Sequence, residues 1–163
     1  SERKEFLKEV YKKIFAITSK PRSIFDLGCG LHPLSFPYKD IVYYASDKNS
    51  NVLRKVKKHF KKNKINGKVI QIDLEKDLVD ISADMVLLFK TLDSLKREVK
   101  KISELLENLK CKWIIVSFPT KTVYGKRMKN PKRVWFEKII KRLKLKYTLI
   151  RHHNEIFYVI RKD

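Results

Sequence analysis

The chain has 163 residues, of which 43% are hydrophobic, so its length allows one domain with a sizeable core and excludes two ordinary ones. Its 39 Lys and Arg residues outnumber 18 Asp and Glu residues, giving a formal net charge of +21 that predicts a polyanionic partner, nucleic acid above all. Two cysteines without zinc-site spacing, and apolar runs no longer than a strand, predict a soluble cytoplasmic protein with reduced thiols, no bound metal and no membrane association.

The first half of the chain alternates between helical and strand periodicity. Apolar residues at helical spacing predict an amphipathic helix over residues 2–17, within an N-terminal segment of residues 1–20. The next predicted elements are a strand at 22–27, a strand at 41–46, a helix at 49–63, an Asn-Gly turn at 66–67 and a strand at 68–72.

The second half continues the alternation and ends in a close pair of strands. The predicted elements are a strand at 84–89, a helix that runs from Leu92 to Leu109, a strand at 111–118, a helix at 131–143, and strands at 146–152 and 155–161. Two residues separate the last two strands, which is too few for a crossover, so they must be antiparallel. The pattern predicts a doubly wound, Rossmann-like α/β fold, with a mostly parallel sheet of seven strands and an antiparallel last strand.

The segment SIFDLGCGLHPLSF, residues 23–36, indicates a ligand site after the first strand. Gly28 and Gly30 follow an apolar strand, where the backbone of such a sheet approaches its ligand closely. The dinucleotide fingerprint needs a third glycine, but position 33 is Pro, and few residues remain for a helix before the next strand. A ligand without phosphates fits better, and S-adenosylmethionine is such a ligand.

Three acidic residues lie at or near the predicted ends of the first three strands. We expect Asp26 to hold the glycine turn and favour the cationic end of the ligand. Asp47 is placed to accept hydrogen bonds from both ribose hydroxyls, and Asp73 to accept one from the adenine amino group. Each acid alone is more often a turn residue or a helix cap, but the ordered set favours a methyltransferase.

The end of the fourth strand indicates which atom is methylated. The run LLFKTLDSL lacks the Asn/Asp-Pro-Pro-aromatic motif of enzymes that methylate exocyclic amines. It also lacks the nearby cysteine nucleophile that enzymes methylating a pyrimidine carbon need. A purine N7 already has a lone pair and needs no base, so positioning alone can support its methylation. Lys90 is then predicted to orient the substrate, although capping or solvating the following helix is an alternative role.

Basic residues gather in two regions. Residues 48–68 contain nine basic and no acidic residues, and residues 121–151 contain twelve basic residues and one acidic residue, Glu137. The predicted RNA contacts are Lys55, Lys58, Lys62, Ser117, Phe118, Pro119, Lys121, Lys126, Arg127 and Trp135. The alternatives are a solvated helix face for the lysines, core packing for Trp135 and a simple strand end for Phe118 and Pro119. His152 and His153 are expected at the surface.

Three segments resemble a known family: IFDLGCGLHPLSF, MVLLFKTLDSLKRE and VSFPTKTVYGKRMKNPKRVWFE. They are similar to the Arm/Rmt group of aminoglycoside-resistance methyltransferases, which act on guanine N7 in small-subunit (16S) ribosomal RNA. The resemblance covers nearly the whole chain. It implies a class I methyltransferase that uses S-adenosyl-L-methionine, releases S-adenosyl-L-homocysteine and acts on the decoding-site helix of the assembled small subunit.

The resemblance also implies site residues. It places Arg3 on the carboxylate of the cosubstrate, and it aligns Asn154 and Glu155 with a family pair on the last strand. We expect the residues beside the motifs to complete the cosubstrate site: Cys29, Lys48, Ile72, Leu74 and Phe89.

The chain departs from the family pattern in three places. His32 stands where the family usually has Asn, the loop between Gly125 and Trp135 is shorter, and the helical N-terminal domain used for ribosome docking is not in this sequence. We therefore expect one methyltransferase domain over residues 1–163, acting as a monomer. The alternatives are a methyltransferase for another RNA, or a non-catalytic RNA-binding or ribosome assembly factor of the same fold.

Overall fold

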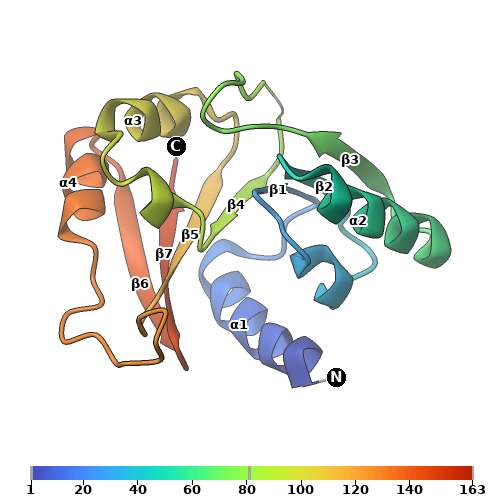
Figure 1. The fold of residues 1–163 in the computed structure, drawn as a ribbon, viewed down its shortest axis with the longest axis horizontal. Helices are drawn as coiled ribbons and strands as arrows, with labels where there is room; N and C mark the ends of the chain where they lie inside the picture. Colours follow the sequence, from blue (N-terminus) through green and yellow to red (C-terminus); the bar gives the residue numbers. More distant parts are fainter. Residues whose placement is uncertain (1, 81, 163) are drawn as a thin grey trace.

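In the computed structural model, which describes residues 2–80 and 82–162, seven strands form one sheet in the order β3-β2-β1-β4-β5-β7-β6 (Figure 1). The strands are β1 (Ser23–Leu27), β2 (Val42–Asp47), β3 (Gly67–Gln71), β4 (Met85–Phe89), β5 (Trp113–Pro119), β6 (Lys146–His152) and β7 (Glu155–Arg161). The first five are parallel, whereas β7 runs antiparallel to both β5 and β6. The predicted doubly wound sheet with an antiparallel last strand is confirmed.

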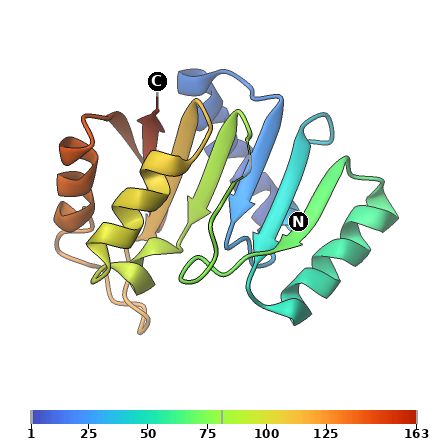
Figure 2. The same ribbon diagram turned by 90° about the horizontal axis from the view of Figure 1, so that it is seen from above.

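Helices cover both faces of this sheet (Figure 2). They are α1 (Glu2–Thr18), α2 (Ser50–Asn63), α3 (Val99–Asn108) and α4 (Val134–Arg142), with short 3-10 turns η1 (His32–Ser35) and η2 (Leu92–Leu95). Alternate residues of β1 point to opposite faces, so Ile24 packs with α1 and α2 while Phe25 packs with α3 and α4. None of the described helices has the length and apolar character needed to cross a membrane.

The central position of β4 explains its composition. It pairs with β1 on one side and β5 on the other, and Met85, Val86, Leu87 and Leu88 are all fully buried. A parallel strand covered on both faces needs apolar side chains at every position. The carboxyl end of this buried strand carries Phe89 and Lys90 to the edge where β1 and β2 also end.

The predicted helix from Leu92 to Leu109 is wrong, because the chain forms η2, a short link and then α3. Side chains three residues apart lie nearly in line on a 3-10 turn, so Leu92 and Leu95 both enter the core. The same turn directs Asp93 toward Arg133, whose Nε and Nη2 donate to the two carboxylate oxygens at 2.9 and 2.8 Å.

Arg133 also explains why α4 starts at Val134 and not at Pro131 as predicted. Its Nη1 donates to the Pro131 carbonyl and its Nη2 donates to the Pro119 carbonyl at 3.0 Å. Its guanidinium lies 4.9 Å from the centre of the Phe118 ring. The residues before α4 are therefore held in an open bend around the guanidinium, which joins η2, the end of β5 and the start of α4.

We expect Arg133→Met to lower the free energy of unfolding by about 2 kcal/mol, because the apolar side chain leaves two carbonyls and Asp93 without their donor. Urea denaturation followed by circular dichroism measures the change. Lys132→Met is the matched control, since Lys132 is the exposed neighbour. Equal denaturation midpoints for the two variants would show that Arg133 does not stabilise this junction.

Candidate functional site

The turn after β1 provides an open backbone surface at the carboxyl edge of the sheet. Gly28 and Gly30 have φ angles of 65° and 52°, a left-handed conformation that glycine adopts without strain. A Cβ on Gly28 would lie 3.0 Å from the Thr91 side chain, whereas a Cβ on Gly30 would meet no atom within 4 Å. The Gly30 backbone therefore faces open space that a ligand can occupy.

Asp47 fastens this turn to the end of β2. Its Oδ2 accepts a hydrogen bond from the Gly30 backbone N–H at 2.9 Å, and its Oδ1 accepts one from the Asn49 N–H at 2.9 Å. A carboxylate oxygen can accept more than one hydrogen bond, so both oxygens keep capacity for a ligand hydroxyl. This arrangement suits the ribose-binding role predicted for Asp47.

A first pocket, of about 140 Å³, opens beside Asp47. It is lined by Gly28, Asp47, Lys48, Ile72, Asp73, Leu74, Glu75, Thr91, Ser94 and Leu95. Four of these residues, Glu75, Thr91, Ser94 and Leu95, were missed from the sequence; Ser94 and Leu95 belong to the region that was predicted as one long helix, and Thr91 directly precedes it.

Asp73 does not end β3 as predicted. The strand stops at Gln71, and Asp73 lies in the turn that follows, where its Oδ1 accepts a hydrogen bond from the Glu75 N–H at 2.9 Å. The turn still brings Asp73 to the wall of the first pocket, beside the apolar side chains of Ile72 and Leu74.

A second pocket, of about 420 Å³, meets the first at Gly28. It is lined by Arg3, Gly28, Cys29, Gly30, Leu31, His32, Ser35, Phe89 and Lys90. Every predicted cosubstrate residue except Asp26 therefore lines one of these two adjoining pockets. The first pocket has three carboxylates and one cation, Lys48, in its walls, whereas the second has two cations, Arg3 and Lys90.

His32 is a neutral group in the wall of the second pocket. Burial lowers the pKa of its imidazole to about 3, and the nearby charges of Arg3 and Lys90 act in the same direction. Its Nε2 lies 2.7 Å from the Tyr11 hydroxyl of α1. The ring thus joins the helix to the glycine turn and adds no further positive charge to this pocket.

Asp26 lies beneath the pockets and not in their walls. Its side chain is buried, its Oδ2 accepts a hydrogen bond from the Tyr43 hydroxyl, and its Oδ1 has no hydrogen-bond partner among the described residues. Burial raises the pKa of this carboxyl to about 8; the Tyr43 hydrogen bond lowers it and the charge of Asp47 raises it further. The predicted direct role as a charge beside the ligand is therefore not what the structure shows.

Glu155 joins three distant parts of the chain. The sequence indicated it only through the resemblance of the Asn154–Glu155 pair to the family. Its side chain is 9% exposed, and its Oε1 lies 3.6 Å from Lys90 Nζ and 4.0 Å from Arg3 Nη1. Lys90 has a φ of 53°, and its N–H donates to both the carbonyl and the hydroxyl oxygen of Ser117. The Lys90 ammonium is thus held at the carboxyl edge, as predicted.

A third pocket, of about 330 Å³, shares Arg3 and Lys90 with the second. Its lining residues are Arg3, Phe6, Lys90, Pro119, Lys121, His153, Asn154 and Glu155. It extends the row of pockets toward the exposed basic loop that follows β5.

The structure separates the predicted RNA contacts into three groups. Pro119 and Lys121 line the third pocket, while Lys126 and Arg127 are exposed in the loop beyond it, and Lys55, Lys58 and Lys62 are exposed on α2. The expected contacts by Ser117 and Phe118 are contradicted, because both side chains are fully buried in the sheet. Trp135 is half-buried against Phe118, with ring centroids 5.8 Å apart, which favours its core-packing alternative.

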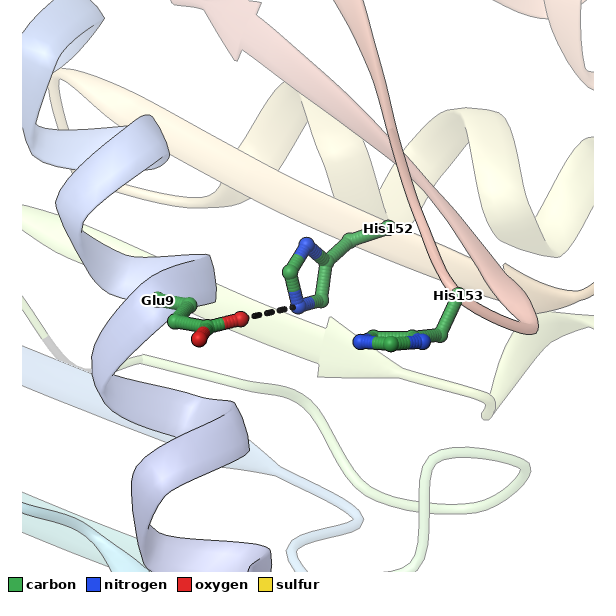
Figure 3. A group of neighbouring side chains, drawn as sticks. All are labelled: Glu9, His152 and His153. Carbon is green, nitrogen blue, oxygen red and sulfur yellow. Dashed lines mark ion pairs between the residues drawn. The ribbon is translucent and has the colours of Figure 1, made fainter.

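His152, predicted at the surface, is in fact 7% exposed and lies in a cluster with Glu9 and His153 (Figure 3). Its Nδ1 lies 3.0 Å from Lys13 Nζ, and its Nε2 lies 3.3 Å from Glu9 Oε2. An ammonium only donates, so Nδ1 accepts and the imidazole proton sits on Nε2, facing the carboxylate. Burial first, and then the Lys13 charge, lower the pKa of this ring. The His152 Nε2 has no hydrogen-bond partner among the described residues, but Nδ1 is occupied by the Lys13 ammonium, whose charge disfavours a cation nearby. The cluster therefore suits a structural contact between α1 and the β6–β7 turn better than a metal ion.

Comparisons with known proteins agree with this geometry. A family model described as ribosomal RNA methyltransferase (FmrO) matches residues 1–159. A 16S rRNA (guanine(1405)-N(7))-methyltransferase of Micromonospora echinospora is 30% identical over 169 residues, an alignment that covers 99% of this chain and 61% of the relative. This chain thus spans less than two thirds of that relative's length.

Solved structures give the same picture of the fold. The 16S rRNA methylase ArmA is 27% identical, with a TM-score of 0.78 over 98% of this chain and 84% of that one. The 16S rRNA methylase RmtB is 24% identical, with a TM-score of 0.82 over 99% of this chain and 64% of that one. The expected class I methyltransferase fold is confirmed.

The buried state of Asp26 predicts a measurable pH dependence of stability. In the unfolded chain this carboxyl titrates near pH 3.9, whereas in the folded chain it keeps its proton up to about pH 8. Between these values the native state binds the extra proton, so the free energy of unfolding falls as pH rises. Asp26→Asn removes this contribution, and we expect the difference from wild type to change by on the order of a few kcal/mol across the window.

Urea denaturation at pH 4.5, 6 and 8 measures this difference. Glu104→Gln, at an exposed position of α3, is the control and should follow the wild-type curve. Parallel pH profiles for wild type and Asp26→Asn would mean that Asp26 is ionised in the folded protein.

Proposed function

The chain belongs to the ribosomal RNA methyltransferase (FmrO) family, and from this premise we propose that it transfers a methyl group from S-adenosylmethionine to N7 of a guanine in 16S ribosomal RNA. In this proposal residues 1–163 act as one methyltransferase domain. The base and position are taken from the names of its relatives, which are 16S rRNA (guanine-N7) methyltransferases.

The observation that carries the proposal is the pair of pockets that meet at Gly28. The first pocket combines apolar walls, Ile72 and Leu74, with the carboxylate of Asp47, as an adenosine requires. The second combines the open Gly30 backbone with the guanidinium of Arg3, which suits an amino-acid carboxylate. The residues present therefore fit S-adenosylmethionine, with its adenosine in the first pocket and its amino-acid end in the second.

The position of Lys90 between the second and third pockets suits an orienting role. Bound S-adenosylmethionine supplies an electrophilic methyl group on a sulfonium. A guanine N7 has its own lone pair, so the protein needs to orient the base and exclude water rather than remove a proton. Lys90 Nζ lies 3.6 Å from the nearly buried carboxylate of Glu155, and an ammonium group only donates hydrogen bonds. It is placed to hold the oxygen atoms of a base or phosphate that enters the third pocket.

The charge distribution supports RNA as the substrate. The cations Lys121, Lys126 and Arg127 are exposed beside the third pocket, and further exposed lysines lie on the surface of α2. Phosphate contacts of this kind release condensed counterions, so binding should weaken steeply as salt concentration rises. These contacts position an RNA backbone without reading its sequence.

One experiment tests both the reaction and the target. Methyl-labelled S-adenosylmethionine is offered with intact small subunits, naked 16S RNA or transfer RNA, and the product nucleoside is identified by mass spectrometry. We expect 7-methylguanosine in the small-subunit sample. A different labelled RNA would support a methyltransferase with another target, and RNA binding without any transfer would support a non-catalytic factor.

We expect Asp47→Ala to weaken S-adenosylmethionine binding by roughly 1.5–3 kcal/mol, the scale of hydrogen bonds to a charged group. Isothermal titration calorimetry measures the affinity. Asp40→Ala is the control, because Asp40 is an exposed aspartate paired with Lys20 on the surface. Unchanged affinity in Asp47→Ala, or no binding by the wild type, would contradict the proposed cosubstrate site.

We expect Lys90→Ala to lower single-turnover methyl transfer by at least about tenfold, or roughly 1.4 kcal/mol of transition-state stabilisation. Because Lys90 is proposed to act on the substrate, the affinity for S-adenosylmethionine should change much less. Lys96→Ala, at an exposed position beyond η2, serves as the control. A Lys90→Ala protein that is less stable but fully active would assign Lys90 a structural role.

A further inference from the structure

The segment after β5 forms a finger, residues 120–130, that extends from the sheet edge before α4 begins (Figure 1). Lys121 and Arg127 pair as an antiparallel bridge, and the Met128 N–H donates to the Thr120 carbonyl at 2.9 Å. At the tip, the Gly125 N–H donates to the Thr122 carbonyl at 2.9 Å. The backbone of the tip is therefore organised as a tight turn.

The base of the finger is fastened to the proposed substrate pocket. Arg133 donates to the carbonyl of Pro119 before the finger and to that of Pro131 after it. The Thr120 N–H donates to the Asn154 carbonyl at 2.8 Å, beside Glu155. Movements of the finger are thus restrained at its root, next to the third pocket.

The tip exposes apolar and aromatic surface. Val123 is 99% exposed and Tyr124 is 97% exposed, so neither side chain packs on the rest of the described chain. Cations surround them, because Lys121, Lys126, Arg127 and Lys129 are all exposed on the same finger. An exposed aromatic ring among cations is the combination by which proteins bind single-stranded nucleic acid: the ring stacks on a base and the cations contact phosphates.

We propose that Tyr124 stacks on an unpaired base of the RNA substrate beside the target nucleotide, while Lys126 and Arg127 contact the flanking phosphates. This inference rests on the proposed function, since it assumes that RNA occupies the third pocket. The tip then adds a contact that depends on an accessible base, and so favours looped over fully paired RNA.

Salt dependence separates stacking from phosphate contact. The probe is a fluorescein-labelled hairpin of the 16S decoding-site sequence, titrated with full-length chain by fluorescence anisotropy at several salt concentrations. Tyr124→Ala should weaken binding by roughly 5- to 150-fold at every salt concentration, with an unchanged slope of log affinity against log salt. Lys126→Gln should reduce that slope by about 1.

Two further variants make the test specific. Tyr124→Phe should bind like wild type, because the ring is kept and only the hydroxyl is lost. Leu78→Ala removes a side chain that is 91% exposed but lies outside the finger, and should also bind like wild type. Thermal unfolding should be unchanged for all four variants, since the substituted side chains lie at the surface.

The proposal is overturned if Tyr124→Ala binds as tightly as wild type, if it alters the salt slope, or if Tyr124→Phe fails to restore affinity. Methylation assays on the same proteins keep this outcome distinct from failure of the proposed function. A wild type that methylates RNA, with Tyr124→Ala binding normally, removes only the stacking role. A wild type that transfers no methyl group to any RNA removes the proposed function itself.

Discussion

One nearly buried carboxylate, that of Glu155, links separate parts of the chain at the carboxyl edge of the sheet, where the pockets lie. In a chain with a net charge of +21, two cations from distant parts of the sequence converge on it: Arg3 from the first helix and Lys90 from the end of β4. Without a shared anion these two like charges would repel each other at the junction of the second and third pockets. This contact brings the side chains of Arg3 and Lys90 together at the junction of the two pockets, whereas the helix α1 itself is held by buried apolar side chains such as Val10 and Ile14.

The charges along the carboxyl edge are sorted by the role that we propose for each pocket. Asp47, Asp73 and Glu75 lie in the first pocket, where hydroxyl and amino groups of an adenosine would donate to them. Lys48 also lines the first pocket, but Arg3 and Lys90 line the second and Lys121 the third, where a carboxylate and then a polyanion would enter. A strongly basic surface would otherwise attract phosphates to the cosubstrate site, and the acidic first pocket opposes that.

The sequence was sufficient for features whose cause is local. Strand alternation, the paired glycines and the acid at the end of β2 each follow from a few neighbouring residues, and these predicted the sheet and most of the pocket walls. The misplacement of Asp73 involves only local hydrogen bonds, but the larger errors involve long-range contacts. The break between η2 and α3 depends on Asp93 meeting Arg133, forty residues away, and His152 is buried because α1 supplies Glu9 and Lys13 against it. The burial of Phe118 could not be predicted either, because the sequence of an apolar strand end does not show whether other elements cover it.

Backbone conformation gives independent support for the importance of this edge. Five non-glycine residues of the described chain have a left-handed φ, and three of them, Ser19, Lys64 and Lys144, simply follow the ends of helices. Of the other two, His153 lies in the two-residue turn between β6 and β7, where a left-handed φ is common, and Lys90 directly follows β4; both line the third pocket. Such a conformation persists at a non-glycine residue only where its surroundings stabilise it, as the Ser117 carbonyl and hydroxyl do for the Lys90 N–H. Ser117, which the sequence suggested as an RNA contact, therefore acts from beneath the surface: its carbonyl and hydroxyl oxygens hold the backbone of Lys90 at the edge of the third pocket.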